Sequence, residues 1–430
     1  MSKTKHPIPE GWKEVKVNEL AKICTGDKDT QNKIDDGQYP FFVRSQNIER
    51  INSFSFDGEA VLTSGDGVGV GKIYHYIKGK FDYHQRVYNI HSFNHDVCGK
   101  WFFFVFKSRF PKRVFSMSAK GSVDSVRMEM ISDMKIKIPE LPEQKAIAQV
   151  LTNFDEGIDL ISCKIDLLKK RKKGLMKQLL TGKKRLPGFS GEWIDVRLGD
   201  VFSFIGGYAF KSSDAIEKGA RWLKIANVGI HSIVWNDCSF LPENFIELYP
   251  NYVLKKDDIV VALTRPILSD MLKIARIKII DSGALLNQRV GKIHCNKKID
   301  KLYLYYVLKL VRIVFNINRM LTGTDPPNLS NKDLHFVKTS IPTDTDEQKA
   351  IAQVLTDADE QIELYEQKLK KVQKQKKYLL NKLVTGEIRL PEFAPSVSYS
   401  LDSSLNEGAL GKAPLNEGGC LGETGGSYEA

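Results

Sequence analysis

The sequence lacks any apolar run long enough to cross a membrane. Its longest such stretches, such as residues 101–106, are far shorter than the roughly 20 residues that a membrane helix needs. Residues 1–7 also lack the apolar segment and the small-residue cleavage site of a secretory signal. We therefore expect a cytoplasmic protein that makes no contact with a membrane.

Cysteine is sparse and dispersed along the chain. The six cysteines are Cys24, Cys98, Cys163, Cys238, Cys295 and Cys420. None of them forms a Cys-x-x-Cys pair, and the eight histidines show no metal-ligand spacing. This pattern argues against a zinc site or a redox dithiol, so we expect reduced thiols and no metal.

Two segments resemble catalytic motifs but lack essential residues. In Asp325-Pro326-Pro327-Asn328, an asparagine stands where an amino-methyltransferase has the aromatic residue that stacks a flipped base. The segment 65–72 resembles a phosphate-binding loop, but Asp66 occupies its first glycine position and Ile73 its Ser/Thr position. Nuclease and helicase motifs are also missing. We expect a non-catalytic chain that binds no cofactor, with a glycine-rich hairpin at 65–72 that could touch DNA.

Size and charge favour a multidomain protein with a polyanionic partner. A chain of 430 residues suits two or three domains. Its 64 basic and 52 acidic residues give a formal charge of +12, which favours binding to a phosphate backbone. Charge alone does not distinguish nucleic acid from an acidic protein.

One long element occurs twice. The ten residues Glu-Gln-Lys-Ala-Ile-Ala-Gln-Val-Leu-Thr at 143–152 recur without change at 347–356, 204 positions later. The match continues without a gap to Phe189 and Phe393, through a Thr-Gly and an Arg-Leu-Pro in each copy. The chain therefore carries an internal duplication.

Both copies have the heptad spacing of a coiled coil. The seam residues are Ile147, Leu151, Phe154, Ile158, Ile161, Ile165 and Leu168 in the first copy and Ile351, Leu355, Ile362, Tyr365, Leu369 and Val372 in the second. Lys172 and Lys376 occupy the same skipped position. We predict helices at 143–180 and 347–384, each about 57 Å long, which pair as an antiparallel coiled coil.

Start and stop signals flank both predicted helices. Pro142 suits a first helical position, residues 345–348 are typical of a capping box, and Gly182 and Gly386 suit left-handed C-caps. The later part of each helix is rich in lysine and arginine. That basic surface is either a solvated face or a stripe that contacts phosphates or a partner protein.

The segments that precede the helices also resemble each other. Trp12, Val15, Val17 and Leu20 correspond to Trp193, Val196, Leu198 and Val201, and Gln85-Arg86-Val87 corresponds to Gln288-Arg289-Val290. Runs such as 259–263 and 272–280 predict strands, and 302–315 predicts a helix. We expect an α+β fold with a pseudo-twofold repeat: domains at 10–140 and 190–342, helical segments at 141–189 and 343–393, and a flexible tail at 394–430.

This order resembles the specificity subunits of type I restriction-modification systems. The resemblance rests on the repeated Glu-Gln-Lys-Ala-Ile-Ala, the Thr-Gly helix ends and the two Gln-Arg-Val tripeptides. Gly323-Thr324 and Asn328-Leu329-Ser330 match a further family element, whereas the first domain departs from it at Gly121-Ser122. It implies two target-recognition domains that read a bipartite, asymmetric double-stranded DNA site. It also implies two modification and two restriction subunits as partners, which would bind S-adenosylmethionine, ATP and Mg.

Candidate DNA contacts are long polar side chains in the divergent parts of the domains, because Arg reads guanine and Asn or Gln reads adenine. They are Arg44, Gln46, Asn47, Lys224, Asn227 and Arg265. Arg86 and Arg289, which both domains share, are better suited to phosphate contact or to supporting the fold. The alternative function is a coiled-coil scaffold or oligomerisation protein without sequence-specific DNA binding.

Overall fold

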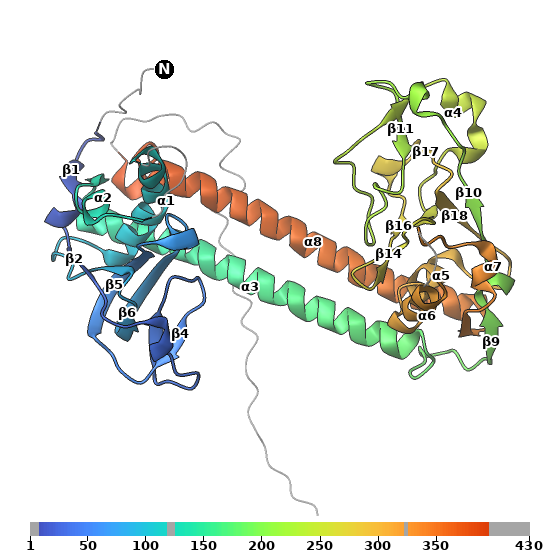
Figure 1. Ribbon diagram of the computed structural model, residues 1–430, viewed down its shortest axis with the longest axis horizontal. Coiled ribbons are helices and arrows are strands. Elements are labelled where there is room, and N and C mark those ends of the chain that lie inside the picture. Colours follow the sequence, from blue (N-terminus) through green and yellow to red (C-terminus); the bar gives the residue numbers. More distant parts are fainter. Residues whose placement is uncertain (1–7, 118–124, 322–325, 395–430) are drawn as a thin grey trace, which may run out of the picture. The chain divides into compact units, whose positions relative to one another are not determined.

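The computed structural model describes residues 8–117, 125–321 and 326–394 (Figure 1). The chain forms two compact units. The first unit comprises Met1–Glu156 and Gln373–Ala430, and the second comprises Gly157–Val372. Each unit therefore combines one sheet-containing domain with part of both long helices.

The first unit is built on a six-stranded sheet with the order β2-β7-β5-β6-β3-β4. Its strands are β2 (Lys22–Thr25), β3 (Tyr39–Phe42), β4 (Glu49–Ile51), β5 (Phe56–Ser64), β6 (Tyr74–Tyr83) and β7 (Val87–His91). Only β3 and β6 pair in parallel. The aromatic-rich helix α1 (Gly99–Met117) packs against β5 and β6, so residues 101–106 are core residues.

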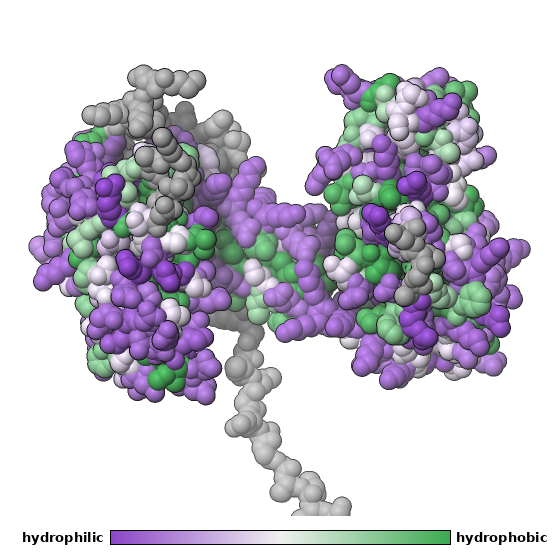
Figure 2. Space-filling view, in the orientation of Figure 1, coloured by the Kyte–Doolittle hydropathy of each residue, from purple (hydrophilic) through white to green (hydrophobic). Residues whose placement is uncertain are grey.

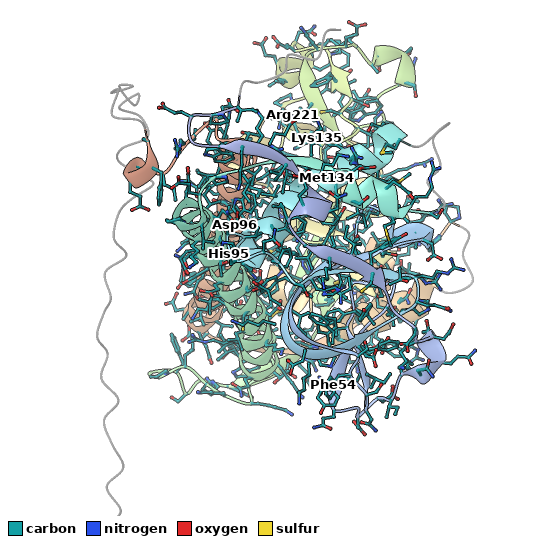
Figure 3. All side chains as sticks on the ribbon, turned by 90° about the vertical axis from the view of Figure 1, so that its left-hand side faces the viewer. Phe54, His95, Asp96, Met134, Lys135 and Arg221 are labelled. Atoms are coloured by element: carbon teal, nitrogen blue, oxygen red, sulfur yellow. The ribbon has the colours of Figure 1, made fainter. Side chains whose placement is uncertain are left out.

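A small sheet joins the beginning and the end of the first domain. Strand β1 (Lys13–Lys16) pairs antiparallel with β8 (Lys135–Ile138), which follows α2 (Met128–Ser132) and leads into the first long helix. Met134 and Lys135, at the start of β8, lie at the opposite end of this unit from Phe54, which follows β4 (Figure 3).

The second unit repeats this plan with shorter strands and two main sheets, β10-β18-β13-β16 and β12-β11-β17. The strands of these sheets are β10 (Phe202–Gly206), β11 (Ala220–Leu223), β12 (Phe240–Leu241), β13 (Ile259–Ala262), β16 (Ile274–Arg276), β17 (Leu285–Leu286) and β18 (Val290–Cys295). Strands β14 (Ile267–Leu268) and β15 (Met271–Leu272) form a hairpin, and β9 (Trp193–Arg197) pairs with β19 (Lys338–Pro342) just as β1 pairs with β8.

The described part of the second unit also contains four short α-helices: α4 (Phe245–Leu248), α5 (Lys301–Val307), α6 (Val311–Leu321) and α7 (Asn331–Leu334). The prediction of a single helix at 302–315 is wrong, because a short turn separates α5 from α6. The strand predicted at 272–280 is likewise shorter, since β16 ends at Arg276 and a 3-10 turn follows at Ile279–Asp281. On the visible face of each unit, hydrophilic residues predominate (Figure 2).

The two long helices are α3 (Leu141–Leu179) and α8 (Thr345–Leu383), each of 39 residues. Gly182 and Gly386 adopt positive φ angles of 69° and 68° just beyond the helix ends, as predicted for C-caps. The predicted capping box at 345–348 is wrong. Asp344 instead accepts a hydrogen bond from the Asp346 backbone N–H, and the Gln348 side chain is used elsewhere.

In each unit the start of one long helix lies beside the end of the other, so the helices pair antiparallel. Of the predicted seam residues, Ile147, Leu151, Ile165, Leu168, Ile351, Leu355 and Ile362 are buried. Phe154, Ile158, Ile161, Tyr365, Leu369 and Val372 are half-buried. This burial is what a coiled-coil seam requires.

The repeated motif forms a joint in which the two copies exchange side chains. The Arg389 guanidinium, from the second copy, donates to both carboxylate oxygens of Glu143 in the first copy at 2.9 and 2.6 Å. In the second unit, Arg185 makes the same bidentate contact with Glu347 at 2.5 and 2.7 Å. The two glutamates are 2% and 0% exposed, so each needs its arginine.

The glutamine of the motif ties each long helix to its own domain. Gln144 donates to the Asp96 and Pro139 carbonyls and accepts from the Cys98 backbone N–H. In the second unit, Gln348 repeats these bonds with Lys298, Pro342 and Asp300. The Glu-Gln pair in each copy therefore has a structural role: the glutamate binds an arginine of the other copy, and the glutamine binds the backbone of its own domain.

The lysines at the skipped heptad positions reach across the helix pair. Lys172 pairs with Asp359, and Lys376 pairs with Asp155, which is the equivalent residue of the other copy. In the second unit the Tyr306 hydroxyl also donates to Asp359, and the Lys309 ammonium lies 4.0 Å from it. Two lysines thus share one carboxylate there.

Lys309 is the more deeply buried of these lysines, with 3% of its side chain exposed. Burial, and then the charge of Lys172, lowers the pKa of its ammonium from 10.5 to about 7. The unfolded chain binds this proton up to a higher pH than the folded chain. The resulting penalty on folding is therefore complete below about pH 7 and shrinks as the pH rises towards 10.5.

We predict that Lys309→Met melts at a higher temperature than the unsubstituted protein at pH 7, because the buried charge is removed. The difference between the two melting temperatures should become smaller from about pH 7.5 to about pH 9.5, because this range lies between the pKa of Lys309 in the folded chain and that in the unfolded chain. Thermal melts of both proteins across this range test it, with the exposed Lys256→Met as control. A Lys309→Met protein that melts lower at pH 7 would contradict the account.

Candidate nucleic-acid interface

The two Gln-Arg-Val tripeptides form the same backbone turn in the two units. The Gln85 N–H donates to Lys28 O, and the Arg86 carbonyl accepts from the Gly65 N–H. In the second unit, Gln288 and Arg289 make the equivalent bonds with Tyr208 and Leu263. All four Gln and Arg residues are exposed. Each unit therefore presents one glutamine and one arginine at the same place on its sheet.

The residue before each tripeptide holds the turn. His84 is buried, and its Nδ1 accepts from the Arg86 N–H at 2.9 Å. Burial, and then the positive charge of Arg44, lowers the pKa of His84, which favours the neutral ring that this bond needs. Asn287 Oδ1 accepts from the Arg289 N–H at 3.0 Å in the same way.

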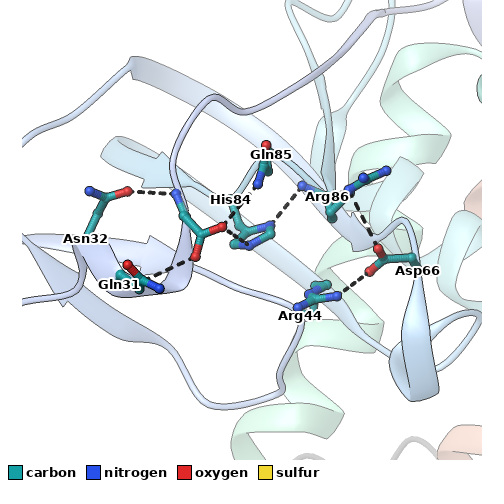
Figure 4. A network of polar contacts seen from close by, with 8 residues as sticks. Gln31, Asn32, Arg44, Asp66, His84, Gln85 and Arg86 are labelled. Carbon is teal, nitrogen blue, oxygen red and sulfur yellow. Dashed lines mark hydrogen bonds and ion pairs between the residues drawn. The ribbon is translucent and has the colours of Figure 1, made fainter.

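In the first unit the turn belongs to a network of charged side chains (Figure 4). Asp66 accepts from Arg44 Nη1 at 2.9 Å and lies 3.8 Å from Arg86 Nε. Asp29 accepts from Gln85 Nε2 at 3.1 Å. Two predicted arginines thus meet on the carboxylate of Asp66, which lies in the glycine-rich segment 65–72.

The glycine-rich segment is a hairpin that joins β5 to β6 beside this network, as predicted. Gly67 and Gly71 have φ angles of 71° and 68°, which a β-branched residue would adopt only under strain. Between them Val68 is 92% exposed. The equivalent connection in the second unit carries the β14-β15 hairpin, with Leu268 exposed near its tip.

The remaining predicted contacts differ in what they are free to do. Gln46, Asn47 and Arg265 are exposed. The Lys224 ammonium instead donates to Ser239 and lies 4.0 Å from the Trp222 ring centroid. Asn227 is 3% exposed, and its side chain bonds to the backbone of its own loop. Base contact by Asn227 would break these bonds, so its position favours a structural role.

The basic parts of the long helices serve more than one purpose. Besides Lys172 and Arg185, Lys169 pairs with Glu366. Lys170, Arg171, Lys173 and Lys177 are exposed, which leaves both the solvated face and a contact stripe open. In the segment 325–328, which resembles a methyltransferase motif, Asn328 accepts a hydrogen bond from Thr264 Oγ1. Of the other residues compared with the family, Gly121, Ser122, Gly323 and Thr324 lie outside the described residues, as does Asp325.

Within the described ranges, no group of three or more His, Cys, Asp or Glu residues could hold a metal ion. No described helix is long and apolar enough to span a membrane. The cysteines in the described part of the chain are free thiols.

Comparison with known proteins identifies the family. The sequence profile of the type I restriction modification DNA specificity domain matches residues 9–170 and again residues 190–374. The chain is 33% identical over 409 residues to the type I restriction enzyme MjaVIII specificity subunit of Methanocaldococcus jannaschii, covering 89% of this chain and 94% of that protein. It is 30% identical over 175 residues to the EcoDI specificity subunit of Escherichia coli, covering 40% and 38% of the two chains.

The fold is also that of a solved structure. The crystal structure of the type I restriction-modification system S subunit from M. genitalium matches with a TM-score of 0.62 at 17% identity, covering 89% of this chain and 98% of that chain. The duplicated α+β fold, the two matches to the family profile and the 409-residue alignment with the MjaVIII specificity subunit all indicate the same family. The chain belongs to the family of specificity subunits of type I restriction-modification systems, whose domains recognise DNA sequences.

Proposed function

We propose that each domain reads one half of a bipartite, asymmetric double-stranded DNA site with the end of its sheet that carries the Gln-Arg turn. The observation that carries this proposal is the repetition of that turn. Its backbone hydrogen bonds are the same in both units, and its glutamine and arginine are exposed in each. The loops around the two turns differ in sequence, as two readers of different half-sites require.

We call the end of each sheet that carries the Gln-Arg turn the reading end. Residues of the reading end that both domains share would have a different role from residues that differ between the domains. Arg86 and Arg289 occur in both turns and would contact phosphates, which position a protein without reading sequence. Arg44, Gln46 and Asn47 in the first unit and Arg265 in the second lie outside the shared tripeptides and would contact bases. The two continuous helices would set the length of the unread spacer between the half-sites.

Catalysis would belong to partner proteins in the cytoplasm. Membership of this family agrees with the non-catalytic role expected from the sequence. We propose two modification subunits, which bind S-adenosylmethionine, and two restriction subunits, which bind ATP and Mg. The duplication supports pairs of partners, because a chain with two similar halves offers two similar docking surfaces.

We predict that the chain, mixed with its methyltransferase subunit and a random duplex pool at moderate salt, retains a two-part motif with a fixed gap. Gln46→Ala should relax one or two bases in one half only. Arg86→Ala should preserve the motif but weaken binding to all duplexes and reduce the salt slope of log K by about one. Sequencing the retained DNA and measuring affinity at several salt concentrations tests both outcomes.

Two results would contradict this assignment. Complex formation without any sequence enrichment would leave only the coiled-coil scaffold. A motif that changes in both halves on Gln46→Ala would show that the first domain does not read a separate half-site.

A further inference from the structure

The two reading ends differ in their acidic residues. In the first unit, Asp66 pairs with Arg44 and Arg86, and Asp29 accepts a hydrogen bond from Gln85, so that these three side chains each face a carboxylate (Figure 4). These contacts are only partly enclosed, since Asp66 is 22% exposed and Arg86 is 65% exposed. Exposed ion pairs of this kind contribute little to folding stability, which points to another role for Asp66.

Backbone hydrogen bonds identify the equivalent positions in the second unit. Gly65 bonds to Arg86 as Leu263 bonds to Arg289, so Thr264 takes the place of Asp66. The Lys28 and Tyr208 carbonyls accept from the two glutamines, so Ala209 takes the place of Asp29.

The second reading end is therefore built without these two carboxylates. Thr264 turns its hydroxyl to Asn328. Arg289 is exposed, and the residues at the two equivalent positions, Ala209 and Thr264, carry no charge. The two carboxylates beside the first Gln-Arg turn thus have no acidic counterpart at the equivalent positions of the second turn.

A carboxylate this close to two guanidinium groups reduces the positive electrostatic potential that DNA encounters at this surface. At about 0.1 M salt, charges interact over roughly 10 Å. A phosphate that approaches Arg44 or Arg86 therefore also senses Asp66. Part of the attraction between arginine and phosphate is lost, and this attraction is the main source of sequence-independent binding. A base edge that offers two acceptors in the right geometry can still compete for an arginine that is held in place.

We propose that Asp66, supported by Asp29, is a specificity determinant of the first domain. It restrains Arg44 and Arg86 and suppresses their binding to phosphates at random sequence, whereas the second domain, with Thr264, supplies more of the salt-dependent affinity. The inference rests on the proposed function, because it assumes that the Gln-Arg end of each domain faces DNA. It goes further by assigning unequal roles to the two domains.

Reciprocal substitutions in the full-length chain test it. Asp66→Asn keeps the side-chain shape and removes the charge, while Thr264→Asp places the charge in the second domain. Asp57→Asn is the matched control, because it changes net charge equally at the other end of β5, roughly 25 Å away along the strand. Affinity for a random-sequence duplex and for the selected site is measured from 50 to 300 mM salt.

Asp66→Asn should bind the random duplex about three- to tenfold more tightly than the control, with a salt slope steeper by about one. Its preference for the selected site should fall. Thr264→Asp should shift both quantities in the opposite direction. Thermal melts establish that each variant is folded, and Thr264→Asp tests the proposal independently if Asp66→Asn does not fold.

The proposal is overturned if Asp66→Asn behaves like Asp57→Asn on random duplex. It is also overturned if Asp66→Asn changes the preferred base at one position while its affinity for random duplex stays constant, because Asp66 would then read that base directly. Failure of the proposed function has a separate signature: Arg86→Ala and Arg289→Ala would both bind DNA as the unsubstituted chain does.

Discussion

The exchanged glutamate-arginine pair is the contact on which the rest of the structure depends. Glu143 and Glu347 are buried at the starts of the two long helices, and each is neutralised by the arginine that follows the other helix. A buried carboxylate without its cation would cost several kcal/mol, on the order of 3–5. The first domain can therefore be completed only when the C-terminal end of the second repeat reaches it.

This constraint explains why the repeated motif varies so little while the domains have diverged. The motif glutamate binds the other copy, the glutamine binds the carbonyls that precede its own helix, and the following apolar residues enter the core of the unit. These glutamate, glutamine and apolar side chains each have a structural partner, so few changes to them are tolerated. The loops around Gln85 and Gln288 do not make these structural contacts, so their sequences can differ between the two domains. Such differences are what the recognition of two different half-sites requires.

Much of this architecture could be predicted from the sequence because its signals are periodic or duplicated. The heptads located both long helices to within about two residues, and the shared Gln-Arg-Val tripeptides located the equivalent turns. The acidic surroundings of Arg86 were not predictable, because Asp29 and Asp66 lie far from it in sequence and their equivalents, Ala209 and Thr264, share no recognisable pattern. The hydrogen bonds of Asn227 to its own loop were not predictable either, because an asparagine that caps its own loop has the same sequence signature as one that faces DNA. DNA contact by Asn227 stays a prediction.

The most direct test of the exchanged joint is hydrogen exchange of a chain that ends at Val372, compared with one that ends at Ala394. The shorter chain lacks Leu383, Val384 and Arg389, which pack in the first unit against its N-terminal part. We predict that amides in residues 8–117 and 125–156 lose most of their protection, while residues 157–321 of the second unit retain theirs. Unchanged protection in the first unit would contradict the account, because that domain would then be complete without the second copy of the repeat.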